Sequence, residues 1–211
     1  MNNIKNVIIV NFFTTLRLIG VFFIIPIYHN YGSIVTGIFL IFIYLTDKID
    51  GTLARKLNAA TFFGSLYDGL SDKLLNFVVL ITLLDISKIA YIPLVIEILI
   101  TIINMLKFKF NQNVKTAEVG RVKMVVFAIT VILTFLLSNL MNESIYFILL
   151  YIPLTIASLT TLLKYAKDFF RNDKNMQHKI YKNRKNLYEK MFDNEFYEEN
   201  KNSKASEMIK K

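Results

Sequence analysis

The chain has 211 residues, of which 54% are hydrophobic, and its mean hydropathy is +0.44. A soluble domain of this length rarely has such a composition. It contains no cysteine, which excludes disulfides and thiolate metal sites. The net charge is +9, but 13 of the 25 basic residues follow residue 163 and most others flank apolar runs. This distribution is typical of a membrane protein beside an anionic leaflet, so no nucleic-acid partner is expected.

The first apolar run, Asn6–Tyr28, is long enough to cross a bilayer, and it lacks the small-residue cleavage site of a removable signal peptide. Asn11, Thr14 and Arg17 recur every third residue within it and therefore lie near one another on a helix. Taken alone, this pattern is explained by an arginine that snorkels to the interface beside two polar neighbours. A turn is predicted at His29–Gly32.

The second apolar run, Ser33–Thr46, has only fourteen residues, which is about 21 Å at the rise of a helix. That length is too short to span the hydrocarbon, so the helix is expected to continue to about Leu57. Asp47 and Asp50 then sit at the inner edge of the hydrocarbon. The predicted turn before the next helix is Asn58–Thr61.

Residues 47–72 combine acidic and small side chains at helical spacing. In the first half, the positions three, four and seven residues after Asp47 lie on the same face of a helix as Asp47 itself. These positions are Asp50, Gly51 and Ala54. The second half presents a stripe with a spacing of four: Gly64, Asp68 and Asp72. If the two helices cross, four carboxylates converge and require cations. The sequence therefore predicts a divalent-metal site for a phosphorylated substrate, with Arg55 as a phosphate clamp.

The third predicted span, Phe62–Leu84, is followed by a turn at Leu84–Ala90 and by a fourth span at Pro93–Phe110. Glu97 and Asn104 lie seven residues apart within the fourth span, on one helix face. An intramembrane carboxylate is a candidate functional group. A structural partner for polar groups on a neighbouring helix explains it equally well.

Basic residues cluster between Lys107 and Lys123, before a fifth span that ends near Leu140, and a sixth span covers about Ile145–Tyr165. The turns expected on the opposite side hold only Lys88. This asymmetry predicts an all-α bundle of six transmembrane helices with both termini in the cytoplasm. Residues 1–167 form the predicted membrane domain. Residues 168–211 form a charged cytoplasmic tail, either solvated or lying on the membrane as an amphipathic helix.

The pattern D-x2-D-G-x2-A-R-x8-G-x3-D-x3-D runs through residues 47–72 without a mismatch. It resembles the signature of the CDP-alcohol phosphatidyltransferases. Eight fixed residues at set spacings would coincide by chance with a frequency on the order of 10⁻¹⁰. The positions that carry the resemblance are Asp47, Asp50, Gly51, Ala54, Arg55, Gly64, Asp68 and Asp72.

The resemblance implies an enzyme that transfers a phosphatidyl group from CDP-diacylglycerol to an alcohol and releases CMP. It implies Mg²⁺ or Mn²⁺ held by Asp47, Asp50 and Asp68, with Asp72 as the catalytic base and an additional ligand. The CDP-lipid would contact the first three of these acids together with Gly51, Ala54, Arg55 and Gly64. The resemblance also implies a homodimer among membrane lipids, and it implies that the stripe of Asn11, Thr14 and Arg17 helps to line the cytosolic cavity. The asymmetry of basic residues places the site on the cytoplasmic side of the plasma membrane.

The resemblance specifies the acceptor alcohol less closely than it specifies the CDP-lipid. Asp72–Lys73 and Gly120–Lys123 resemble the phosphatidylglycerophosphate synthase branch, whose acceptor is sn-glycerol 3-phosphate. That acceptor would be bound by polar and basic residues: Thr14, Arg17, Lys115, Arg121 and Lys123. Three residues depart from the branch pattern, and the last two stand where arginine is common: Gly69, Ile96 and Asn104. An inositol phosphate, serine or a second lipid stays open as the acceptor.

Two other functions fit parts of the sequence. Intramembrane aspartates also occur in cation transporters, although here they cluster toward one side beside an arginine that repels cations. A catalytically silent scaffold is the second alternative, but it need not keep all eight signature residues. His29 and His178 are the two histidines and lack a matching ligand cluster. The abundance of Lys, Asn and Ile indicates an AT-rich, bacterial genome.

Overall fold

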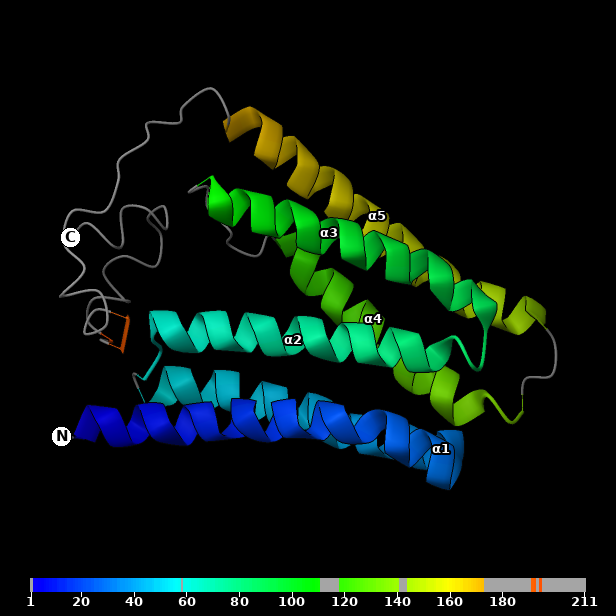
Figure 1. The fold of residues 1–211 in the computed structure, drawn as a ribbon, viewed down its shortest axis with the longest axis horizontal. Coiled ribbons are helices and arrows are strands. Elements are labelled where there is room, and N and C mark those ends of the chain that lie inside the picture. Colours follow the sequence, from blue (N-terminus) through cyan, green and yellow to red (C-terminus); the bar gives the residue numbers. More distant parts are fainter. Residues whose placement is uncertain are drawn as a thin grey trace.

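The computed structural model describes residues 2–57, 59–110, 118–140, 144–172, 191–192 and 194, without the side chains of 2–5, 48, 50, 51, 53–55, 62, 108, 118, 144, 145 and 172. These residues form five α-helices and one short 3₁₀ helix, and no strand occurs among them (Figure 1). The elements are α1 (Asn2–Lys56), α2 (Phe62–Leu83), η1 (Lys88–Ala90), α3 (Tyr91–Lys109), α4 (Glu118–Leu137) and α5 (Ser144–Asn172).

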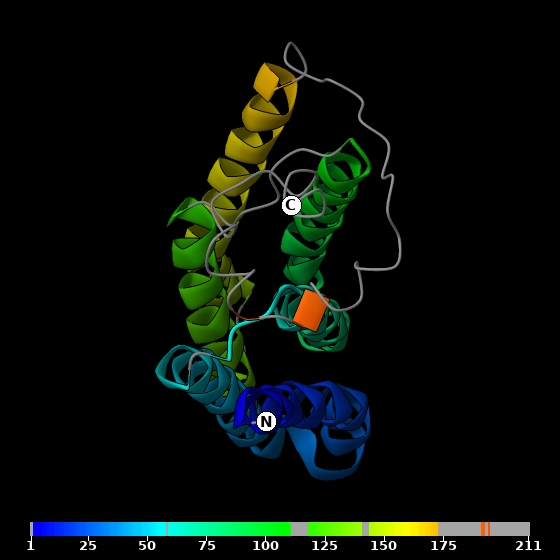
Figure 2. The same ribbon diagram turned by 90° about the vertical axis from the view of Figure 1, so that its left-hand side faces the viewer.

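Helix α1 consists of two helical segments joined at Gly32. The backbone there has φ 80° and ψ −178°, a conformation that glycine adopts readily because it has no Cβ. The chain reverses at this residue, and the second segment runs back against the first, with Ile43 close to Gly20 (Figures 1 and 2). The predicted turn at His29–Gly32 is thereby corrected to one residue. The two segments of α1 correspond to the first two predicted helices, and the prediction of six membrane spans stays a prediction.

The helices pack around a main apolar core, with two smaller apolar clusters beside it. Helix α1 packs against α2 and α4, while α3 and α4 each pack against α5. Gly37 allows the returning segment of α1 to approach α4, because a Cβ at this position would lie 2.9 Å from Leu136 Cδ2. The side chains that fill the centre come from every helix and η1: Val21, Ile24, Leu40, Ile43, Leu75, Val79, Leu80, Leu83, Ala90, Leu94, Phe127, Val131, Phe135, Phe147, Tyr151 and Leu154.

Large apolar side chains also cover the outside of the bundle. Phe12, Phe22 and Phe42 are each more than 60% exposed on α1. Four helical stretches are long and apolar enough to cross a membrane: Asn6–Asp47, Lys88–Lys107, Val119–Leu137 and Tyr146–Arg171. Helix α2 is less apolar, because every eighteen-residue stretch of it contains two aspartates and a lysine. The chain is a membrane protein with multiple candidate transmembrane helices.

The helix termini and connections lie at two opposite ends of the bundle. The N-terminus, the α1–α2 connection and the C-terminal ends of α3 and α5 lie at one end, while Gly32 and η1 lie at the other (Figure 1). Helix α2 follows its prediction to within one residue. Helix α4 begins at Glu118, so Arg121 and Lys123 lie inside its first two turns. Helix α5 continues to Asn172 and so passes through the predicted domain boundary at residue 167.

Candidate active site

Three of the four signature aspartates converge between α1 and α2. Asp47 comes from the returning segment of α1, and Asp68 and Asp72 lie one helical turn apart on α2. One carboxylate oxygen from each lies within 4.8 Å of the others. The three side chains are partly buried, with exposed fractions of 41%, 44% and 28%. The side chain of Asp50 lies outside the described residues.

Arg17 reaches this cluster from the first segment of α1. Its side chain is completely buried, and its guanidinium forms ion pairs with all three carboxylates. Nη1 contacts Asp47 and Asp72, and Nη2 contacts Asp68. The interpretation of Arg17 as a snorkelling arginine is wrong, because a snorkelling side chain ends in water. Its predicted contact with the acceptor stays a prediction.

A close approach of α1 to α2 brings Arg17 to the aspartates. Thr61 caps the start of α2 by accepting a hydrogen bond from the Gly64 amide at 3.0 Å. A Cβ on Gly64 would lie 3.1 Å from the Thr61 hydroxyl and 3.3 Å from Asn11 Oδ1. A second link joins the hydroxyls of Thr15 and Tyr67 at 3.2 Å. Gly64 therefore supports the predicted close contact between the two helices.

The other signature residues of α1 cannot be placed as side chains. Gly51, Ala54 and Arg55 belong to the helix, but their side chains lie outside the described residues, so the phosphate clamp stays a prediction. Thr14 is buried on the first segment, one turn before Arg17. Its predicted contact with the acceptor likewise stays a prediction.

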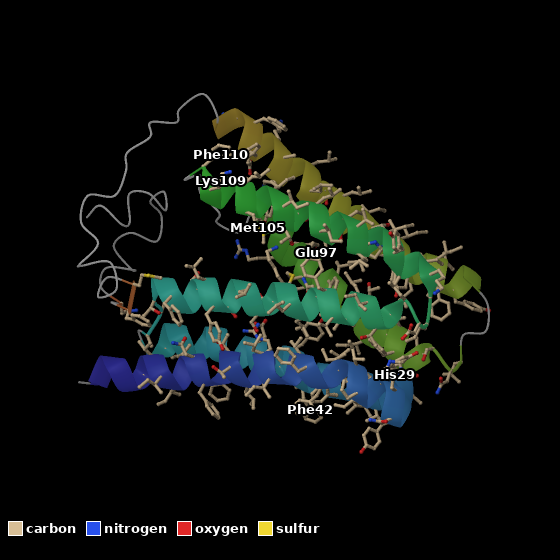
Figure 3. The ribbon with its side chains drawn as sticks, in the orientation of Figure 1. His29, Phe42, Glu97, Met105, Lys109 and Phe110 are labelled. Atoms are coloured by element: carbon tan, nitrogen blue, oxygen red, sulfur yellow. The ribbon has the colours of Figure 1, made fainter. Side chains whose placement is uncertain are left out.

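A second polar cluster lies inside the bundle between α2, α3 and α4. Lys123 Nζ lies 2.6 Å from Glu97 Oε2, and both side chains are about 95% buried. Asn76 Nδ2 donates to Glu97 Oε1 at 3.4 Å. Glu97 thus lies on the inner side of α3, whereas Phe42 points away from the bundle (Figure 3). The expected polar partner on a neighbouring helix is confirmed for Glu97 by Asn76 of α2, and Lys123 of α4 is a second partner that the sequence did not indicate.

Lys73 lies between the two clusters. It follows Asp72 directly on α2, and its ammonium donates to the Thr101 hydroxyl at 3.2 Å. It also interacts electrostatically with Glu97, Lys123 and Asp72. Sequence reasoning did not assign a role to Lys73 or to Asn76. The signal was present for Asn76, because it continues the four-residue spacing of Asp68 and Asp72.

The residues predicted to bind the acceptor do not all share one face. Lys123 is buried, whereas Arg121, two positions earlier on α4, is exposed. Positions two apart on a helix point in nearly opposite directions. Lys115 lies outside the described residues. The structure therefore brings Lys123 to the α2–α3 interface and leaves Arg121 on the opposite side of its helix.

The C-terminal tail touches the connection between the two halves of the signature. Asn194 is 6% exposed, and its side-chain amide donates to the Ala60 carbonyl at 2.6 Å. The Phe192 ring lies 4.9 Å from the Phe63 ring. The tail is therefore not solvated at Asn194, which corrects that part of the expectation.

Comparison with known proteins identifies the fold that carries these clusters. The model of the CDP-alcohol phosphatidyltransferase family matches residues 7–162. The chain belongs to this family. It is therefore an enzyme of the CDP-alcohol phosphatidyltransferase family. This assignment decides against the transporter that the intramembrane aspartates left open.

A curated relative is similar to part of this chain. The chain is 43% identical over 75 residues to the CDP-diacylglycerol–glycerol-3-phosphate 3-phosphatidyltransferase of Wigglesworthia glossinidia brevipalpis. The matched segment is 34% of this chain and spans 41% of the length of that relative.

The cluster of Asp47, Asp68 and Asp72 has ligands suited to the divalent metal ion on which the family depends. Carboxylate oxygens are the ligands that hard divalent cations prefer, and three of them lie within reach of one ion. Among the described side chains, the three carboxylates also exceed the single guanidinium that contacts them. The cluster can therefore bind a divalent ion.

Proposed function

We propose that this enzyme transfers the phosphatidyl group of CDP-diacylglycerol to sn-glycerol 3-phosphate, giving phosphatidylglycerophosphate and CMP. The observation that carries the proposal is the convergence of Asp47, Asp68 and Asp72 in a chain of this family. The partial match to a glycerol-3-phosphate 3-phosphatidyltransferase supports the choice of acceptor.

The reaction needs one proton transfer and one displacement at phosphorus. A hydroxyl oxygen of the acceptor attacks the phosphorus that bears the lipid, and the bond from this phosphorus to the CMP oxygen breaks. The hydroxyl proton goes to the carboxylate of Asp72, and the electron pair of the broken bond leaves with CMP. Asp72 suits this role because its carboxylate is the least exposed of the three and lies next to Lys73, toward the second cluster.

The metal site is proposed at Asp47, Asp50 and Asp68, with Asp72 as a further ligand, and the ion as Mg²⁺ or Mn²⁺. When bound, the ion neutralises the negative charge of the diphosphate and of the departing CMP. Arg55 is proposed to contact the same diphosphate. Gly51, Ala54 and Gly64 would leave space for the nucleotide.

The acceptor is proposed to carry a phosphate because the second cluster has an excess of positive charge. Lys73 and Lys123 both interact with Glu97, the one carboxylate among the described residues of this cluster. A phosphate dianion would satisfy two ammonium groups, whereas serine, a zwitterion without net charge, would not. An inositol phosphate would satisfy them equally, so the choice of glycerol 3-phosphate rests on the partial match. Thr14, Arg17, Lys115 and Arg121 are kept as proposed acceptor-binding residues, with Arg121 on the opposite side of α4 from Lys123.

The enzyme is proposed to span the plasma membrane six times as a homodimer, with residues 1–167 as its catalytic domain. The two segments of α1 count as two spans, and α2 is proposed as a further span that carries Asp68 and Asp72. Because the chain has no cysteine, single cysteines test this topology. Cysteine at Lys56 should react with an impermeant maleimide only after the cells are opened, and cysteine at Asn30 should react in intact cells. The reverse pattern would refute the cytoplasmic site.

The acceptor can be decided in one assay. Purified protein is incubated with radiolabelled CDP-diacylglycerol, Mg²⁺ or Mn²⁺, and one of four acceptors: sn-glycerol 3-phosphate, inositol phosphate, serine or phosphatidylglycerol. Labelled phosphatidylglycerophosphate from the first alone is the expected product. Product from serine or from the lipid alone would overturn the phosphorylated acceptor, and product from none would overturn the transferase proposal.

A further inference from the structure

Arg17 contacts the carboxylates that belong to the candidate metal site. It approaches from the first segment of α1, whereas the aspartates come from the second segment and from α2. Its side chain is fully buried, while each aspartate side chain keeps a surface open to solvent. The guanidinium thus fills the closed side of the cluster.

The space within the cluster is small. The three carboxylate oxygens lie within 4.8 Å of one another, and the guanidinium forms ion pairs with all three aspartates. A divalent ion held by these three carboxylates would lie close to a guanidinium of like charge in a partly buried site. The two cations therefore oppose each other for the same three aspartates.

We propose that Arg17 and the divalent ion are alternative partners of Asp47, Asp68 and Asp72. Arg17 keeps the acidic side chains together before the ion binds, and the ion releases the guanidinium from them. Arg17 is on this view a positioning residue that weakens metal binding. The proposal rests on the proposed function only in placing the metal ion at these aspartates.

A stabilising role alone would have the opposite effect on metal binding. If Arg17 only oriented the ligands, its loss would disorganise the site and weaken binding of the ion. If it competes with the ion, its loss leaves the carboxylates uncompensated until the ion arrives, so the ion binds more tightly. The sign of the change in affinity therefore distinguishes the two roles.

The test uses Mn²⁺ alone, with no substrate. The free ion is measured by electron paramagnetic resonance during titration of chelator-treated, purified full-length protein. Arg17→Gln is expected to bind Mn²⁺ at least tenfold more tightly than the unmodified chain. Its unfolding temperature should fall without Mn²⁺ and recover when Mn²⁺ is added. Lys88→Gln removes an exposed positive charge at the other end of the bundle and should change neither value.

Arg17→Lys covers the case in which the glutamine variant does not fold. A single ammonium contacts fewer carboxylates than a guanidinium, so this variant should bind Mn²⁺ more tightly than the unmodified chain, though less tightly than Arg17→Gln. Equal or weaker binding in whichever variant folds would overturn the proposal. Such a result would leave the acceptor assay unaffected, because that assay tests product formation.

Discussion

The two buried polar clusters of this bundle differ in the sign of their excess charge. Around Arg17, three carboxylates from two helices surround one guanidinium, and all three are partly open to solvent. Around Glu97, two ammonium groups interact with one carboxylate, and the pair of Glu97 and Lys123 is closed off from solvent. Lys73, next in sequence to Asp72, lies where the two clusters adjoin.

This difference assigns a different kind of partner to each cluster. An excess of carboxylates in a partly buried site is stable only with further cations, which a dissolved metal ion provides. An excess of ammonium groups favours an anion, and the phosphate of an acceptor alcohol has the matching charge. A phosphatidyl transfer needs both, because one substrate brings a diphosphate and the other brings the nucleophile. The predictions below change one cluster at a time.

The largest loss of activity is expected from a change at Asp72, where the two clusters adjoin. Asp72→Asn removes the proposed base and should lower CMP release by about 10²–10⁴-fold, because asparagine cannot accept the hydroxyl proton. The measurement is CMP release by purified protein, together with membrane insertion. Asp85→Asn is the matched control, since Asp85 is exposed at the opposite end of the bundle. Normal turnover in the Asp72 variant would refute the assignment of the base.

The second cluster can be broken and rebuilt with its charges exchanged. Lys123→Gln leaves Glu97 buried without its ammonium, and breaking a buried pair in this way costs about 3–5 kcal/mol of stability. The variant should also raise the KM for the acceptor more than that for the CDP-lipid.

The double variant Glu97→Lys with Lys123→Glu keeps an ion pair but moves the ammonium from α4 to α3. Thermal unfolding should show partial recovery of stability, while the KM for the acceptor should stay high. Recovery of both would mean that Lys123 has only a structural role.

A smaller effect is expected from the contact between α1 and α2. Gly64→Ala places a methyl group 3.1 Å from the Thr61 hydroxyl and 3.3 Å from Asn11 Oδ1, so these groups must shift by a few tenths of an ångström. We expect the shift at Asn11 to move α1 away from α2 and Arg17 away from Asp68, so turnover should fall several-fold with a change in the Mn²⁺ titration. Gly69→Ala on the same helix meets nothing within 4 Å and is the control. Equal turnover in the two variants would show that this contact does not set the geometry of the site.

The acidic cluster could be predicted from sequence because local spacing assembles most of it. Asp68 and Asp72 are one turn apart, and only a short connection separates α2 from the end of α1. The ion pairs of Arg17 could not be predicted, since they join residues 30 to 55 positions apart across two helices. The pair of Glu97 and Lys123 likewise depends on how α3 and α4 pack. Spacing rules describe one helix, and partners on different helices follow from tertiary packing.

The break in α1 shows the same limit at the level of the backbone. The predicted turn at His29–Gly32 was placed correctly along the chain, but a single glycine with positive φ is sufficient to reverse it. Sequence composition shows that a turn occurs but not how many residues lose helical geometry. The length of α5 was underestimated for a related reason, because its last turns carry charged residues and are still helical.

The smallest effect is expected from a change at Arg121. Arg121 is exposed and lies two residues from Lys123, on the opposite side of α4. An exposed guanidinium is screened by water and salt, so Arg121→Ala should raise the KM for the acceptor only a few-fold, and less than Lys123→Gln does. Lys109→Ala removes an exposed cation at the same end of the bundle and should leave both KM values unchanged. If Arg121→Ala raises the KM values of both substrates equally, Arg121 does not belong to the acceptor pocket, and the excess positive charge of the second cluster rests on Lys73 and Lys123 alone.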